Sequence, residues 1–141
     1  MPSTNANLDV RNFPSNGSDG YTNTTASNNA VYSYMYSGGN DGAGGMEVRV
    51  NSGTATLNLS LDDDNNRYSI DAVSFLDDTG NQLTWRGNAP ANGVITDANT
   101  VEETAHYKVR VADTTAGCTF QCDPVISNER DPPKGLIRHT H

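Results

Sequence analysis

The chain has 141 residues, enough for one domain, and its hydrophobic share of 34% lies below the ordinary globular range. Its formal net charge is −8, from 17 acidic and 9 basic residues. Nine dispersed cations cannot form the basic track that a phosphate backbone or an anionic membrane surface requires, so we expect neither nucleic acid nor membrane as a partner.

The first part of the chain is dominated by Asn, Ser, Thr and Gly and offers little to bury. Residues 1–29 are therefore predicted to form an extended polar arm. The N-terminus has neither the basic start nor the apolar stretch of a secretory signal. We therefore expect a cytoplasmic protein, or one released without a classical signal peptide.

The middle of the chain alternates apolar and polar residues with a period of two, which is typical of half-buried strands. Residues 46–50 and 55–61 alternate in this way on either side of a polar turn, and we interpret them as a hairpin. Residues 68–75 change phase part way, which predicts a bulge near residues 71–73. A short strand that includes Trp85 follows.

Residues 105–122 predict the clearest hairpin, with two alternating segments around a polar turn at residues 113–117. Its two cysteines lie four residues apart on one face of a strand. A rise of about 3.3 Å per residue separates them too widely for a disulfide, so we expect two buried free thiols. The apolar face of this hairpin consists of Tyr107, Val109, Val111, Cys118, Phe120 and Cys122.

These segments together predict an all-β fold. We expect a single immunoglobulin-like antiparallel β-sandwich over residues 30–127, with the polar arm before it and a C-terminal tail over residues 128–141.

Four aromatic residues are candidates for an interaction surface. Tyr32, Tyr34 and Tyr36 share one face of a predicted strand, and tyrosine offers a large contact area with a polar tip, suited to a protein or a sugar. Trp85 is the only tryptophan. Packing within a half-buried sheet is the alternative for the tyrosines, and an interior position is the alternative for Trp85.

Clustered carboxylates make the acidic turn at residues 62–66 the best candidate for a calcium site. Asp62 and Asp64 of this turn would bind the ion together with Asp77 and Asp78 from the next turn. The spacing does not match an EF-hand loop, and a solvated turn is the favoured alternative.

The sequence offers little for catalysis. His106 is predicted to lie on the polar face of its strand, beside Lys108 and Arg110, whereas Cys118 and Cys122 follow Phe120 to the other face. A Cys–His dyad is therefore not expected, and we predict that the protein is not an enzyme and needs no cofactor.

The segment Cys-Asp-Pro-Val-Ile-Ser-Asn-Glu at residues 122–129 follows an alternating strand at residues 107–111 and the turn at residues 113–117. In this C-terminal part the chain resembles the DP-EP family of small bacterial proteins, which is named for its Asp-Pro and Glu-Pro pairs. The resemblance implies an immunoglobulin-like sandwich and carries no established activity.

Two functions from different classes follow. The first is a non-enzymatic β-sandwich interaction or self-assembly module, which binds a protein partner or a second copy of the chain. The alternative is a calcium-assisted carbohydrate-binding module that uses the acidic turns and the nearby Trp85.

Overall fold

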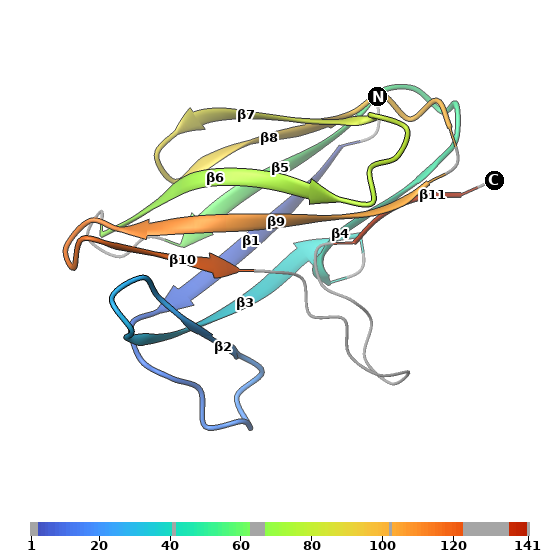
Figure 1. Ribbon diagram of the computed structural model, residues 1–141. Helices are drawn as coiled ribbons and strands as arrows, with labels where there is room; N and C mark the ends of the chain where they lie inside the picture. The colour runs from blue at the N-terminus through green and yellow to red at the C-terminus, as the bar shows by residue number, and fades with distance from the viewer. Residues whose placement is uncertain (1–2, 41, 63–66, 102, 123–135, 141) are drawn as a thin grey trace.

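The computed structural model describes residues 3–40, 42–62, 67–101, 103–122 and 136–140 of the chain (Figure 1). In these residues the secondary structure consists of strands joined by turns, as expected from the two-residue periodicity. The strands are β1 (Ser3–Arg11), β2 (Thr22–Thr25), β3 (Val31–Gly39), β4 (Ala43–Arg49), β5 (Ala55–Asp62), β6 (Tyr68–Leu76), β7 (Leu83–Ala89), β8 (Asn92–Asp97), β9 (Thr104–Asp113), β10 (Cys118–Cys122) and β11 (Leu136–Thr140).

The strands form two sheets packed against each other, which confirms the predicted β-sandwich (Figure 1). Sheet A has the order β2, β3, β1, β5, β8, β7. In sheet B, β9 pairs with β6 along one edge and with β10 and β11, end to end, along the other. Strand β4 pairs with β11 and, at Gly38 and Gly39, with β3, so it connects the two sheets.

The sequence predicted an antiparallel sandwich, but the strand pairing in the structure is mixed. Strand β1 runs parallel to β5, and β4 runs parallel to β11 and to the end of β3. Parallel neighbours usually need long connections, and the chain between β1 and β5 and between β4 and β11 passes through strands of the other sheet, whereas β3 and β4 meet only where one ends and the other begins.

The core lies between the sheets and is built by alternate residues of nearly every strand. Most inward side chains are apolar or aromatic, with Asp97 and Asp113 as charged exceptions, and their neighbours in the strand lie on the outer face. The most deeply buried side chains include Leu8, Leu57, Leu59, Ile95, Tyr107, Val109, Val111, Cys122 and Ile137.

The N-terminal arm predicted over residues 1–29 is not what the described residues form. Residues 3–11 are strand β1, which lies inside sheet A between β3 and β5. Its inward side chains Ala6, Leu8 and Val10 are buried, and this burial outweighs the polar composition of the segment.

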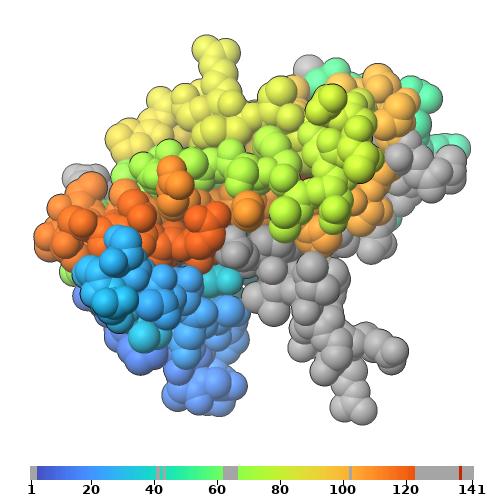
Figure 2. Space-filling model, in the orientation of Figure 1, coloured from blue at the N-terminus to red at the C-terminus, as the bar shows by residue number. Residues whose placement is uncertain are grey.

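Residues 22–25 form β2, which pairs with β3. In Figure 2 the light-blue residues around β2 lie against the red-orange strand β10, where Ser27 donates its backbone N–H to the Thr119 carbonyl at 2.9 Å.

Two further expectations are corrected. The tail expected over residues 128–141 contains strand β11, whose Ile137 is fully buried between β4 and β9. Strands β4 and β5 do not form the predicted hairpin, because they pair with different neighbours, β4 with β11 and β5 with β1 and β8. The turn between them is held by Asn99, whose side-chain N–H₂ donates to the carbonyls of Arg49 and Gly53 at 2.7 and 3.1 Å.

Three local predictions are confirmed. Strands β9 and β10 form the antiparallel hairpin, with Cys118 opposite Asp113. The register of β6 against β9 shifts between Ile70 and Ala72, which is the predicted bulge. Both cysteines are buried and free.

Candidate functional site

The tyrosine stripe belongs to the core and presents no surface to a partner. The side chains of Tyr32, Tyr34 and Tyr36 are all buried, because β3 turns this face toward sheet B. Tyr36 packs edge-on against Tyr107 at 5.6 Å between ring centroids, and Tyr32 stacks on Phe120 at 4.4 Å. The three tyrosines therefore pack within the core, which was the alternative interpretation of the sequence.

Trp85 is also an inward residue, on the same face of sheet A as its partner Ile95. Its ring lies across Gly93 of the neighbouring strand, where a Cβ atom would come within 2.4 Å of the indole. The ring is partly buried against the core because β7 is the last strand of the sheet. Only a glycine at position 93 leaves room for the indole ring, so the role of Trp85 here is packing against β8.

The four carboxylates considered for calcium are not gathered into a site that the structure describes. Asp64 and the side chain of Asp62 lie outside the described residues. Asp78 accepts hydrogen bonds from the backbone N–H groups of Gln82 and Leu83, at 2.8 and 3.1 Å, so both of its oxygens close a turn. Asp77 is exposed and has a left-handed backbone, φ 63°. Within the described ranges, no group of three or more His, Cys, Asp or Glu side chains could hold a metal ion.

The inward carboxylate of Asp113 is the centre of a polar cluster that joins the two sheets. Its side chain is fully buried and ion-pairs with Arg67, with Nη2 at 2.8 Å from Oδ2. Tyr32 of sheet A donates its hydroxyl to Oδ2 at 2.6 Å, and the backbone N–H groups of Thr115 and Ala116 donate to Oδ1. Burial alone would raise the pKa of Asp113, but the hydrogen bonds from Arg67, Tyr32 and Ala116 outweigh it and lower the pKa.

The two thiols lie beside this cluster and in the core. Cys118 Sγ is 3.2 Å from the Tyr32 hydroxyl, whose pKa is raised first by burial and then by the hydrogen bond to Asp113. Cys122 is fully buried. Both thiols are therefore enclosed by the fold, and neither presents its sulfur at the surface.

His106 is predicted to lie on the polar face of its strand, but in the structure it is only 8% exposed. It does occupy the outer phase of β9, between Leu76 of β6 and Leu136 of β11 in the register. Neither ring nitrogen has a hydrogen-bond partner among the residues that the structure describes. Burial lowers the pKa of His106, and the charge of Asp77 opposes this weakly. The ring is a buried neutral imidazole without the orienting partner that a general base needs.

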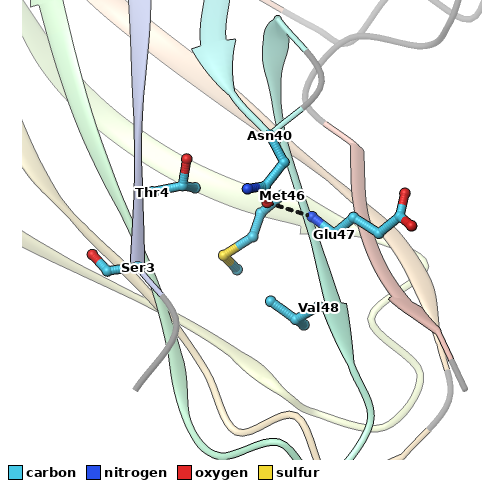
Figure 3. Close-up of a pocket in the computed structure, with 6 residues that line it drawn as sticks. All are labelled: Ser3, Thr4, Asn40, Met46, Glu47 and Val48. Atoms are coloured by element: carbon cyan, nitrogen blue, oxygen red, sulfur yellow. Dashed lines mark hydrogen bonds between the residues drawn. The ribbon is translucent and has the colours of Figure 1, made fainter.

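A small cavity of about 150 Å³ lies between the start of β1 and strand β4. Figure 3 shows Met46 and Val48 pointing toward β1, while the Glu47 carboxylate is directed away from them. The carboxamide oxygen of Asn40 accepts the Glu47 backbone N–H at 2.8 Å. Pockets for drug-sized ligands usually measure ~300–1,000 Å³, so this cavity is too small for such a molecule. It gathers no group of acids and bases, and we do not assign a function to it.

The outer face of sheet A is the most distinctive surface in the described residues. Its side chains form rows across β1, β5, β8 and β7, because paired residues of neighbouring strands point to the same side. Apart from Val94, Arg86 and Ala89, every position in these rows carries a hydroxyl or a carboxamide. We call this surface the sheet A face; it consists of Ser3, Thr56, Thr96 and Thr84 in one row, Asn5, Asn58, Val94 and Arg86 in the next, and Ser37, Asn7, Ser60, Asn92 and Ala89 in the third.

Hydrogen bonds between side chains hold part of the sheet A face in place. Asn58 donates its carboxamide N–H₂ to Asn5 Oδ1 at 2.9 Å, and Thr56 donates its hydroxyl to Ser3 Oγ at 3.1 Å. Carboxylates begin only in the following row, where Asp9 of β1 pairs with Asp62 of β5. The sheet A face is therefore an ordered, almost uncharged polar surface.

An arginine held between two aromatic rings lies at the far end of β1, on the same outer side. The guanidinium carbon of Arg11 is 3.6 Å from the Tyr21 ring centroid and 4.6 Å from that of Phe13. Arg11 also donates to Ser33 Oγ at 2.9 Å and pairs with Asp19 at 2.7 Å. We call Arg11, Phe13 and Tyr21 the Arg11 stack.

The Arg11 stack shapes the loop between β1 and β2 into a raised border of the sheet A face. Ser33, an outward residue of β3, is fully buried beneath this loop and donates its hydroxyl to the Phe13 carbonyl at 2.8 Å. Tyr21 donates its hydroxyl to Asp9, which raises the pKa of Tyr21 to about 12. Phe13 remains 52% exposed.

The charge of Arg11 is compensated by Asp19. Hydrogen bonds from Ser15 and then Arg11 lower the pKa of Asp19 to about 2, so this carboxylate stays ionised beside the guanidinium. Arg11, Asp19 and the Tyr21–Asp9 pair thus form a closed network at the border. A ligand that reached this border would meet the exposed Phe13 ring and not a free charge of Arg11.

No model of a known protein family matches the chain, and no curated protein sequence matches it. The resemblance of residues 122–129 to the DP-EP family therefore stays a prediction, and residues 123–129 lie outside the described part of the chain. Across the residues that the structure covers, no helix is long and apolar enough to cross a membrane.

Proposed function

We propose that this protein is a non-enzymatic β-sandwich module that acts by contact, with the sheet A face and the Arg11 stack as its contact surface. The observation that carries the proposal is the charge of this surface. In a chain of net charge −8, three adjacent rows hold hydroxyls, carboxamides, Val94, Ala89 and one cation, Arg86, and no carboxylate.

This surface suits contact because its side chains are already positioned. The strands beneath it are held by a core that includes Leu8, Leu57 and Ile95, all fully buried. Short side chains on a paired sheet lose little rotamer freedom when a ligand arrives, which lowers the entropic cost of binding.

The residues that the sequence offered for catalysis support the same view, since each is committed to the interior. The two cysteines are buried. His106 is buried without a partner. Calcium is not part of the proposal, because Asp78 uses its carboxylate to bind backbone N–H groups.

Two classes of occupant fit a contact module of this kind. A second copy of the chain or another protein could approach the sheet A face without the like-charge repulsion that a net charge of −8 causes elsewhere. A carbohydrate could exchange hydrogen bonds with its hydroxyls and carboxamides. We also propose the location expected from the sequence, which is the cytoplasm or release without a classical signal peptide.

The proposal is tested with two matched substitutions that each turn a carboxamide into a carboxylate. Asn58→Asp places a charge at the centre of the sheet A face, and Gln121→Glu places one on the outer side of β10, in sheet B. The full-length protein is studied by light scattering, in EDTA and then in calcium, and by retention on immobilised neutral polysaccharides. We expect any self-association or retention to be weakened by Asn58→Asp and unchanged by Gln121→Glu.

Two results would overturn the proposal. One is a protein that neither self-associates nor is retained in any of these conditions. The other is a contact that Gln121→Glu abolishes while Asn58→Asp leaves it intact, since this would move the contact surface to sheet B. Thermal unfolding of both variants shows whether the fold is unchanged.

A further inference from the structure

We infer that the occupant of the sheet A face is a neutral polysaccharide chain, which lies along the polar rows and stacks one sugar on Phe13 of the Arg11 stack. The inference rests on the proposed function, because it names the ligand of the same surface. It assigns roles to residues that the sequence analysis did not single out.

The first argument is the match between the polar rows and sugar hydroxyls. Threonine and serine hydroxyls both donate and accept hydrogen bonds, and asparagine does the same through separate atoms. The Asn58 N–H₂ donates to Asn5 Oδ1 and to Ser3 Oγ, which leaves the Asn5 N–H₂ and the Asn58 oxygen for a ligand. The Asn58–Asn5 bond also fixes both carboxamides in one orientation, so these groups are preorganised.

The second, independent argument is the Arg11 stack. A sugar ring has an apolar face of C–H groups that packs on an aromatic ring. Phe13 is 52% exposed, yet its ring is not loose, because it packs on the guanidinium that Ser33 and Asp19 hold in place. The loop between β1 and β2 thus presents a fixed aromatic surface at the border of a polar floor.

The third argument is charge, and it excludes other ligands. An anionic polysaccharide or a phosphate would need free cations, but Arg11 is paired with Asp19, and Arg86 is the single cation of the rows. A protein interface normally has an apolar centre, and the only apolar side chains of the three rows are Val94 and, at their edge, the small Ala89. The chemistry of the surface therefore favours a neutral ligand that is rich in hydroxyls.

The distance between the two parts of the site sets the size of the ligand. Asn7 and Arg11 are outward residues of the same strand, and four residues of β1 span roughly 13 Å. A single sugar cannot reach both the polar rows and Phe13. The site therefore fits a chain of several sugars and not a monosaccharide.

The test is native gel electrophoresis of the full-length protein through gels that contain one soluble polysaccharide each, in EDTA. The neutral probes are hydroxyethylcellulose, arabinoxylan and galactomannan, and the anionic probe is alginate. We expect at least one neutral polysaccharide to retard the protein and alginate to leave its mobility unchanged. Xylohexaose or cellohexaose competes with this retardation, and the matching monosaccharide does not.

Variants locate the binding surface. Phe13→Ala and Asn58→Asp are each expected to weaken binding roughly tenfold, the effect of losing one aromatic contact or one set of ordered hydrogen bonds. Leu76→Ala and Gln121→Glu are the matched controls, because they remove an exposed apolar side chain and a carboxamide from sheet B. Both controls should bind like the wild type.

Three outcomes would overturn the inference. The first is a protein that no neutral polysaccharide retards, and the second is retardation that Phe13→Ala and Asn58→Asp leave intact. The third is self-association that Asn58→Asp abolishes without any polysaccharide binding, in which case the proposed function stands and a second copy is the occupant. A protein that shows no self-association and no retardation would refute the inference and the proposed function together.

Discussion

Strand β9 buries a polar side chain near each of its ends, and the two ends satisfy these side chains very differently. Asp113 at the C-terminal end accepts hydrogen bonds from Arg67, from Tyr32 of the other sheet and from two backbone N–H groups. His106 near the other end is also buried, and neither of its ring nitrogens has a partner.

The difference shows that burial of a polar group says little about its role until its partners are known. A fully hydrogen-bonded carboxylate with a paired cation ties two sheets together, and losing one member leaves the others buried and unpaired. An imidazole without partners costs free energy in the folded state. We therefore expect opposite effects when the two residues are replaced.

The largest effect is expected for Asp113→Ala. The substitution leaves the Tyr32 hydroxyl and the Arg67 guanidinium without their partner, and we expect it to lower the free energy of unfolding by about 3 kcal/mol in urea denaturation. The control is Asp71→Ala, which removes an acid from an exposed pair with Arg110 and should cost about 0.5 kcal/mol. Equal losses in the two variants would contradict the distinction between the buried and the exposed pair.

Tyr32→Phe examines one contact of the same cluster. The ring and its stacking on Phe120 are retained, so the substitution removes only the hydroxyl that donates to Asp113. We expect a loss of about 1 kcal/mol in the free energy of unfolding, again by urea denaturation. Tyr21→Phe removes a hydroxyl bonded to Asp9 on the surface and should cost less; a larger loss there would show that the inter-sheet bond is not the stronger one.

His106→Leu is expected to act in the opposite direction. Leucine fills a similar space without bringing buried polar atoms, so the free energy of unfolding should stay the same or rise by up to about 1 kcal/mol. His106→Gln keeps polar atoms at the site and should bring no gain. A clear loss in His106→Leu, measured by urea denaturation, would mean that the imidazole makes a stabilising contact.

The two ends of β9 should also respond to acid in separate pH ranges. The pKa of His106 is lowered on folding, so the unfolded chain binds a proton more readily, and stability falls as the pH drops below the ordinary value of 6.5. The pKa of Asp113 is also lowered, so its stabilising contribution is kept until the pH falls below its ordinary value of 3.8.

Urea denaturation of the wild type and of His106→Leu, at a series of pH values, measures this effect. We expect His106 to cost the wild type at most about 1.4 kcal/mol for each pH unit below 6.5, the limit for one proton, and His106→Leu to lose less than the wild type. Parallel curves for the two proteins would show that other groups cause the acid sensitivity.

Alternation in the sequence was enough to predict several of the strands that form the core. Leu57 and Leu59 of β5, and the hairpin of β9 and β10, follow a strict two-residue period and are buried as expected. The bulge near Asp71 was visible because the apolar phase changes after Ile70. These features depend on neighbouring residues alone, and this is why the sequence reveals them.

Strand β1 was missed although it has the same period. Its apolar residues Ala6, Leu8 and Val10 are few and mostly small, and the Asn, Ser and Thr around them indicated an arm. The inward phase of Asp113 continues that of Val109 and Val111, so the sequence does contain a signal for its burial. That its partners are Arg67 and Tyr32 depends on contacts across the sandwich and could not be inferred from the chain.

The sheet A face shows the same limit. The outward residues Ser3, Asn5 and Asn58 can be identified from alternation within each strand. Their arrangement in rows depends on the register of β1 against β5, which are separated in the chain by two strands of sheet A and by β4. The Arg11 stack depends further on how one loop returns over β3, and no local pattern predicts this.

The parallel pairing of β1 with β5 has a consequence for the order in which the chain can fold. The first strand has no neighbour in sheet A until β3 and β5 exist, and β11 completes sheet B by pairing Ile137 with Met46 from the first half of the chain. Most pairings thus close long loops, and such topologies fold in milliseconds to seconds and not in microseconds. During that time, and during synthesis from the N-terminus, the backbone of β1 offers an unpaired strand to other chains.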